Sequence, residues 1–238
     1  MLGGIAGLAN VFGAAIVSAR PWSRTFLAYF IALGSGFMLA TALTEMIPES
    51  LRMTPEGAAW RAPLLILAGY FIVHFFEHTW PAHFHFGEET HPQEFFNASV
   101  AYSALGGLLI HTFFDGVAIA SGFLVSRWLG MVIFGAVILH NIPEGFTMAS
   151  IMNAAQKSRG AGLWAATGLG ASRILGILAM TLTQRFVSQG LALSSGVTLY
   201  VAASDLIPEV NKMHGLKIAL TVAAGVGMVV VLRWLFLT

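Results

Sequence analysis

The chain contains no cysteine and few charged residues. Of its 238 residues, none is cysteine and only 10% are Asp, Glu, Lys or Arg. The absence of cysteine excludes disulfide bonds and thiolate metal sites, so any metal must bind to His nitrogens or side-chain oxygens. Soluble domains carry about 25% charged residues. The shortage of charge, together with 57% hydrophobic residues, therefore indicates an integral membrane protein.

The few charges are nearly balanced in sign. The formal net charge is +1, so we expect no nucleic-acid partner, and the lipid bilayer is the expected surrounding. The chain begins with a small-residue apolar run, and we expect no separate signal peptide with a cleavage site.

Eight apolar stretches are long enough to cross a membrane, which takes about 20 residues. We predict an all-α integral membrane protein with a single transmembrane domain, residues 1–238. The expected transmembrane helices cover residues 2–19, 26–48, 62–78, 98–125, 128–153, 160–182, 190–208 and 214–236.

Basic residues divide unevenly between the two sides of this predicted bundle. The loops after odd-numbered spans hold six Lys and Arg residues, and those after even-numbered spans hold four. Because cytoplasmic loops carry the excess of basic residues, we expect the termini to be extracytoplasmic and the plasma or inner membrane to be the location.

One predicted loop, residues 79–97, is rich in His and Glu and lies between the third and fourth spans. It contains His83, His85 and His91, three glutamates, and neither Lys nor Arg. Such a tract either binds metal weakly or is a solvated acidic loop. The charge asymmetry places it in the cytoplasm.

A short motif occurs twice, at the ends of the second and seventh spans. Residues 42–49 read ALTEMIPE, and residues 202–209 read AASDLIPE. Secondary transporters are often built from repeats inverted across the membrane, with the binding site at the repeat interface. We therefore predict a 3+2+3 arrangement in which the fourth and fifth spans form a central pair. Glu45 and Asp205, in the repeated segments, would line the entrance.

The central pair carries two matched motifs, HTFFDG from His111 and HNIPEG from His140. In each, a histidine precedes a carboxylate, Asp115 or Glu144, by four residues, a spacing that places both side chains on one helical face. Ionisable residues in hydrocarbon are expensive and usually functional. The four residues predict a divalent-cation site partway across the membrane. The alternative is a set of hydrogen bonds between helices.

Two neighbours of the second motif extend this prediction. Asn141 offers an amide oxygen. Pro143 has no backbone N–H, so a carbonyl one turn earlier, near Leu139, loses its helical partner. In a membrane such a carbonyl must be satisfied, and a bound ion or water is one way.

The end of the third span holds a second, smaller group of candidate ligands. His74 and His78 lie on one helical face with Glu77 nearby. These side chains either receive an ion that leaves the central site or cap the helix at the membrane interface.

These motifs resemble the ZIP (Zrt/Irt-like) family of divalent metal transporters. The resemblance rests on HNIPEG, on HTFFDG followed by VAIASGF, and on the acid-plus-proline endings of the second and seventh spans, and it covers essentially the whole chain. It implies eight spans and uptake of zinc, or of iron, manganese or cadmium, into the cytoplasm, with the ion as substrate and no cofactor. It also implies a metal site made from His111, Asp115, His140, Asn141 and Glu144, with Thr112 beside it.

One position departs from the family pattern. Some members with a two-metal site carry a glutamate in the sixth span before an Ile-Leu-Gly run, where this chain has Arg173. An arginine near the middle of a span costs about 2.5–3.5 kcal/mol on insertion scales, so we expect Arg173 to face the carboxylates. Our hypothesis is that its guanidinium replaces the second metal and leaves a single-ion site. The alternative is that Arg173 snorkels or pairs elsewhere.

Three other functions compete with a carrier. A selective divalent-metal channel would use the same residues. An intramembrane metalloenzyme needs an open metal position and a separate general base, and the chain has no H-E-x-x-H motif, so we expect no enzyme. A metal sensor would need a soluble output domain, and these loops are too short for one. Ion preference, coupling ion and oligomeric state stay open, and a homodimer is compatible with the sequence.

Overall fold

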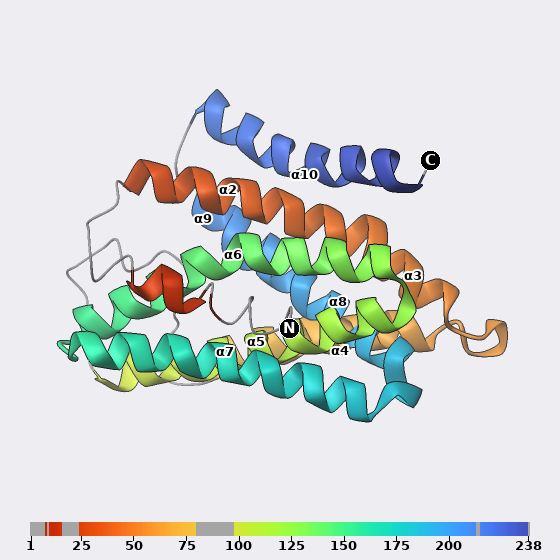
Figure 1. Cartoon of the computed structure of the whole chain (residues 1–238), viewed down its shortest axis with the longest axis horizontal. Helices are drawn as coiled ribbons and strands as arrows, with labels where there is room; N and C mark the ends of the chain where they lie inside the picture. Colours follow the sequence, from red (N-terminus) through yellow and green to blue (C-terminus); the bar gives the residue numbers. More distant parts are fainter. Residues whose placement is uncertain (1–7, 9, 16–23, 80–97, 213–214, 238) are drawn as a thin grey trace.

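The computed structural model describes residues 8, 10–15, 24–79, 98–212 and 215–237, and these residues form helices with short connections and no strand (Figure 1). Seven helical segments are long and apolar enough to cross a membrane. They confirm an all-α protein and match seven of the predicted spans. Of the first predicted span, residues 10–15 are described and helical. Residues 80–97, which make up nearly all of the His/Glu-rich tract, lie outside the described residues.

The described elements follow the predicted order, with two interruptions. The predicted second and seventh spans are each divided into an α-helix, a π-helical turn and a second α-helix. The elements are α2 (Arg24–Ala40), η1 (Thr41–Met46), α3 (Ile47–Arg52), η2 (Glu56–Ala58), α4 (Arg61–Thr79), α5 (Ala98–Val125), α6 (Arg127–Ala154), α7 (Arg159–Leu182), η4 (Gln184–Phe186), α8 (Val187–Tyr200), η5 (Val201–Leu206), α9 (Ile207–Asn211) and α10 (Leu216–Leu237).

The two π-helical turns, η1 and η5, coincide with the repeated motif. Position 41 recurs at 201 and position 46 at 206, a constant shift of 160 residues. In both copies an Ile-Pro pair opens the following helix. Proline has no N–H to continue the regular ladder, and π-helical turns are common at functional sites. The repeat seen in the sequence is therefore also a repeat of backbone conformation.

Reciprocal glycine contacts join the helices in pairs. A Cβ placed on any of these glycines would lie 1.9–2.2 Å from a carbonyl oxygen of the partner helix. In every case this carbonyl belongs to the residue three positions before the partner glycine. Small residues let helices approach this closely in lipid. The pairs are Gly36 with Gly225 (α2 and α10), Gly69 with Gly196 (α4 and α8), Gly116 with Gly176 (α5 and α7), and Gly13 with Gly145 (residues 10–15 and α6).

The bundle has an apolar exterior and a polar interior. Helices α4 and α10 lie at the periphery, with 17% of each candidate span buried, and α10 runs beside α2 in Figure 1. Exposed large hydrophobic residues such as Phe71, Phe75 and Trp234 cover them, as a lipid-facing surface requires. The interior holds the buried polar residues of α5, α6 and α7.

Candidate metal site

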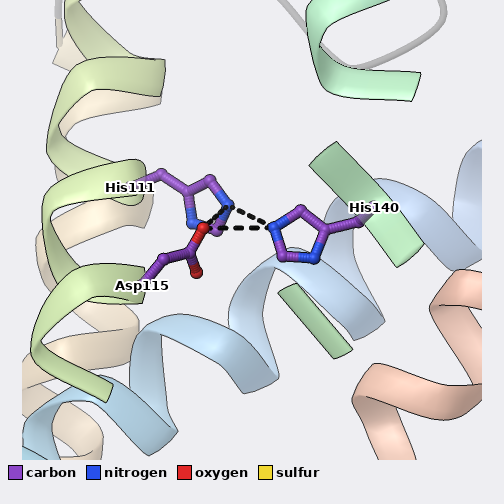
Figure 2. Close-up of side chains that lie close together, drawn as sticks. All are labelled: His111, Asp115 and His140. Carbon is purple, nitrogen blue, oxygen red and sulfur yellow. Dashed lines mark hydrogen bonds and ion pairs between the residues drawn. The ribbon is translucent and has the colours of Figure 1, made fainter. Parts of the chain in front are cut away.

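Three buried donor atoms meet where α5 and α6 cross. His111 and Asp115 come from α5, and His140 comes from α6 (Figure 2). The two histidine Nε2 atoms are 3.4 Å apart, and Asp115 Oδ2 lies 3.2 Å from the His140 nitrogen and 3.5 Å from the His111 nitrogen. A tetrahedral zinc ion with bonds near 2.0–2.1 Å separates its ligand atoms by about 3.3 Å. The trio therefore has the spacing of one face of a zinc site.

The His140 ring is oriented for metal binding by its own helix. Its Nδ1 lies 2.9 Å from the carbonyl oxygen of Ala136. A carbonyl only accepts hydrogen bonds, so Nδ1 carries the proton, and a neutral ring presents its Nε2 lone pair to the trio. In the neutral ring this lone pair points at the Asp115 carboxylate, whereas a protonated ring donates to that carboxylate at 3.2 Å. A metal cation between the two groups would take the place of that proton.

Arg173 of α7 lies next to this trio and is fully buried, with 0% exposure. One guanidinium nitrogen is 3.2 Å from Asp115 Oδ2, 3.4 Å from Glu144 Oε2 and 2.8 Å from Asn141 Oδ1. The arginine thus contacts both motif carboxylates. A buried charge is tolerated only when it is paired and hydrogen bonded, and this guanidinium is both.

Asn10, a residue that no sequence motif singles out, completes the polar network. Its side chain is fully buried, and its Oδ1 accepts a hydrogen bond of 2.5 Å from Arg173. Its Nδ2 donates a hydrogen bond of 2.5 Å to Glu144 Oε2. The available signal was a lone Asn in an apolar run three residues before a glycine, and this pattern gains meaning only when the partner helix is known.

The glycine that ends each metal motif fixes the neighbouring helix. A Cβ on Gly116 would lie 2.0 Å from the carbonyl oxygen of Arg173, and one on Gly145 would lie 2.0 Å from the carbonyl oxygen of Asn10. These carbonyls belong to the two residues whose side chains enter the site. The H-x-x-x-[DE]-G motif therefore supplies ligands and also seats the residues that contact those ligands.

The remaining predicted ligands are arranged less directly. Glu144 is not part of the three-residue group. Its Oε2 bonds to Arg173 and Asn10, and its buried Oε1 has no hydrogen-bond partner among the described residues. The Thr112 hydroxyl donates to the carbonyl oxygens of Leu108 and Leu109 on its own helix. The carbonyl of Leu139, one turn before Pro143, faces Gly34 of α2.

The candidates of the third span and the seventh-span repeat lie together, away from the trio. The Tyr200 hydroxyl donates to Glu77 Oε2 at 2.7 Å, and Asp205 lies within hydrogen-bonding reach of Glu77. The rings of His74 and His78 are 4.1 Å apart, and the ring of His74 also packs against Tyr200. These residues form a separate acidic and histidine-containing cluster.

Glu45, the matching acid of the other repeat, has different partners. Its Oε1 is 2.7 Å from an Arg233 nitrogen, and its Oε2 accepts a hydrogen bond of 3.0 Å from the indole of Trp128. Neither partner was expected from the sequence. Both lie near helix ends, where aromatic and basic residues usually mark the membrane interface.

Seven apolar spans and a buried His/Asp group that could hold a metal ion define the class: a multi-pass membrane protein with a candidate internal metal site. The family model of the ZIP zinc transporters matches residues 1–100 and 87–233. The chain belongs to this family. It is also similar to the mouse protein named metal cation symporter ZIP14, at 21% identity over an alignment of 291 residues. That alignment covers 88% of this chain and 59% of the mouse protein.

Membership of the family reduces the number of possible functions. ZIP proteins transport divalent metal cations and are not enzymes, so the metalloenzyme alternative is not favoured. The buried His/Asp group provides ligands that suit such an ion as substrate.

Proposed function

We propose that this chain carries a divalent metal cation, first of all zinc, across a membrane into the cytoplasm. The ion would bind between α5 and α6 to His111, Asp115 and His140. The observation that carries the proposal is the spacing of the three buried donor atoms, 3.2–3.5 Å, since a tetrahedral zinc ion separates its ligands by about 3.3 Å. The name of the mouse relative, a metal cation symporter, agrees with an ion as substrate.

The site would hold one ion at a time. Arg173 is within 3.4 Å of both Asp115 and Glu144, and its guanidinium supplies the positive charge that a second metal would otherwise bring. Glu144 and Asn141 would complete the site, with the buried Oε1 of Glu144 available as a further ligand.

Transport would proceed by alternating access in an eight-span, 3+2+3 bundle with inverted repeats. The matched π-helical turns and the matched glycine pairs support two related halves. The motif-bearing helices would move against the rest, with Glu45 near one end of the pathway and Asp205, Glu77, His74 and His78 near the other. We place the termini outside a plasma or inner membrane.

Zinc uptake into liposomes tests the assigned site. Purified protein should take up radioactive zinc or cadmium, and His140→Ala or Glu144→Ala should abolish most of the uptake, because each variant removes a group of the buried site. The matched control is Glu56→Ala, which removes an exposed carboxylate in the turn after α3. Unchanged uptake in both site variants would refute the assignment. Competition by iron, manganese and cobalt would rank the ions.

Metal stoichiometry tests the single-ion proposal. Purified protein should bind one zinc ion in the central site, and Arg173→Glu should raise the number to two, because it replaces the internal cation with a ligand. Elemental analysis after desalting measures the ratio. Two tightly bound ions in the unaltered central site would contradict the role of Arg173 and leave the transport proposal standing.

A further inference from the structure

Glu45, Trp128 and Arg233 form a cluster, here called the Glu45 latch, that joins three helical segments at one end of the bundle. Glu45 lies in η1, Trp128 at the start of α6 and Arg233 near the end of α10. In Figure 1 the C-terminal end of α10 lies on the same side of the molecule as α3, which follows η1. The ring of Trp128 also packs against Phe236 of α10 at 5.9 Å.

Both oxygens of the Glu45 carboxylate are occupied in the latch. Arg233 lies 2.7 Å from Oε1, and the Trp128 indole donates to Oε2 at 3.0 Å. The Glu45 side chain is 6% exposed, whereas that of Arg233 is 53% exposed. A nearly buried carboxylate is therefore neutralised by a cation that reaches it from the outside.

Arg233 has a second attachment in the same turn. It donates to the carbonyl oxygen of Thr44 at 3.2 Å. This carbonyl lies four residues before Pro48, which has no N–H to donate to it. One guanidinium thus contacts both the acid and a backbone carbonyl of the π-helical turn. Withdrawal of Arg233 would leave both groups without this partner.

An apolar layer separates the latch from the metal site. On α6, Leu129, Ile133 and Val137 follow Trp128 along one helical face and lead to His140. The distance from Trp128 to His140 along the helix is about 18 Å, at about 1.5 Å per residue. The layer consists of Met46, Ala118, Ile119, Leu129, Ile133, Val137 and Leu191, all buried. In channels, hydrophobic constrictions close pathways by excluding water, and a packed apolar layer excludes water in the same way.

The matched position at the other end has the opposite charge. Arg233 lies eight residues after Gly225, and Glu77 lies eight residues after Gly69, the glycine in the equivalent helix pair. The acid of the second repeat, Asp205, therefore meets Glu77 where Glu45 meets an arginine. The repeated backbone arrangement therefore places a cation beside its acid at one end of the bundle and a second acid beside it at the other end.

We propose that the Glu45 latch holds this end of the pathway closed and that a divalent ion entering here displaces Arg233 from Glu45. This inference rests on the proposed function, because it gives the transported ion a first carboxylate. Arg233 acts as a tethered cation that occupies Glu45 until a divalent ion takes its place. The displacement frees α10 from η1 and exposes the apolar layer beneath.

The absence of native cysteine makes a direct test possible. Val137→Cys places a thiol in the apolar layer, and a membrane-impermeant thiol reagent reports access from the latch side. Arg233→Gln should raise the labelling rate roughly tenfold or more, as expected when a charge-assisted hydrogen bond is lost. Arg233→Lys, which keeps the charge, should change the rate much less. Gly57→Cys, in the exposed turn on the same side, should label equally in every background.

The addition of zinc tests whether a divalent ion displaces Arg233 from Glu45. Zinc added with the reagent should raise the labelling of Val137→Cys in the otherwise unaltered chain, and it should have no effect when Glu45→Gln is also present. Trp128→Phe provides a second weakened latch if Arg233→Gln does not fold.

Equal labelling of Val137→Cys in folded Arg233→Gln, Trp128→Phe and parent backgrounds would overturn the latch. Labelling requires no transport, so a failure of the latch leaves the His140→Ala uptake result unaffected. If the uptake experiment refuted the transport proposal, the labelling result would still stand.

Discussion

The two copies of the repeated segment share a backbone and differ in their electrostatics. η1 and η5 have the same π-helical conformation, and each presents an acid, Glu45 or Asp205, before an Ile-Pro pair. Glu45 meets Arg233, whereas Asp205 meets Glu77. The difference teaches that the repeat fixes where an acid is placed, and that side chains on the neighbouring helices decide whether this acid is already neutralised.

The largest expected effect concerns the glycines that end the two metal motifs. It tests whether both motifs depend equally on their close contact with a neighbouring helix. Gly116→Leu and Gly145→Leu should each abolish folding, because a Cβ at either position would lie 2.0 Å from a backbone carbonyl and overpacking is strongly destabilising. Size-exclusion chromatography of a fluorescent fusion measures the folded fraction. Gly106→Leu on α5, where a Cβ has no neighbour within 4 Å, is the control. Survival of one motif variant and loss of the other would break the equivalence.

A second prediction compares the two arginines that neutralise acids. Arg173→Leu should destabilise the metal-free protein by about 3–5 kcal/mol, because it leaves two buried carboxylates without their cation. Arg233→Leu should cost less, about 1.5–3 kcal/mol, the usual value of a hydrogen bond to a charged group, since this guanidinium is 53% exposed and Glu45 keeps its contact with Trp128. Thermal unfolding in detergent with a chelator measures both. Equal losses would mean that exposure does not separate the two arginines.

The smallest expected effect concerns Asn10, which, like Arg173, lies three positions before a glycine of a matched pair. Asn10→Ala should weaken zinc binding about 10–100-fold, the usual effect of removing a group that orients metal ligands. Fold and stoichiometry should be retained, because the charges are unchanged. Zinc titration calorimetry measures the affinity, with Asn153→Ala at the exposed end of α6 as control. Unaltered affinity would assign Asn10 to packing alone.

Much of the fold could be predicted because lipid restricts the choices. Hydrocarbon requires each span to satisfy its own backbone, so apolar length alone located seven helices. The spacing of His111 and Asp115 fixed a shared helical face before any packing was known. The sequence also indicated that Arg173 would face the carboxylates, because a lipid-facing arginine is too expensive, and the structure places its guanidinium there.

The partners that sequence reasoning missed depend on packing between distant segments. Asn10 and Glu144 are 134 residues apart, and Arg233 and Glu45 are 188 apart. No local spacing connects such pairs. Arg233 also lies near a span end, where a basic residue is normally interfacial. The π-helical turns could not be predicted either, because a proline in a span indicates an interruption of the helical hydrogen bonds without specifying which conformation results.

The glycine contacts also divide the molecule mechanically. The eight contacts that would bring a Cβ within 2.2 Å of a carbonyl lie inside four separate helix pairs: residues 10–15 with α6, α5 with α7, α2 with α10, and α4 with α8. Within the described residues none of these contacts joins one pair to another. Sliding of one pair against another would therefore leave every such contact intact. The hydrogen bond from Trp128 of α6 to Glu45, in the turn that follows α2, links two of these pairs.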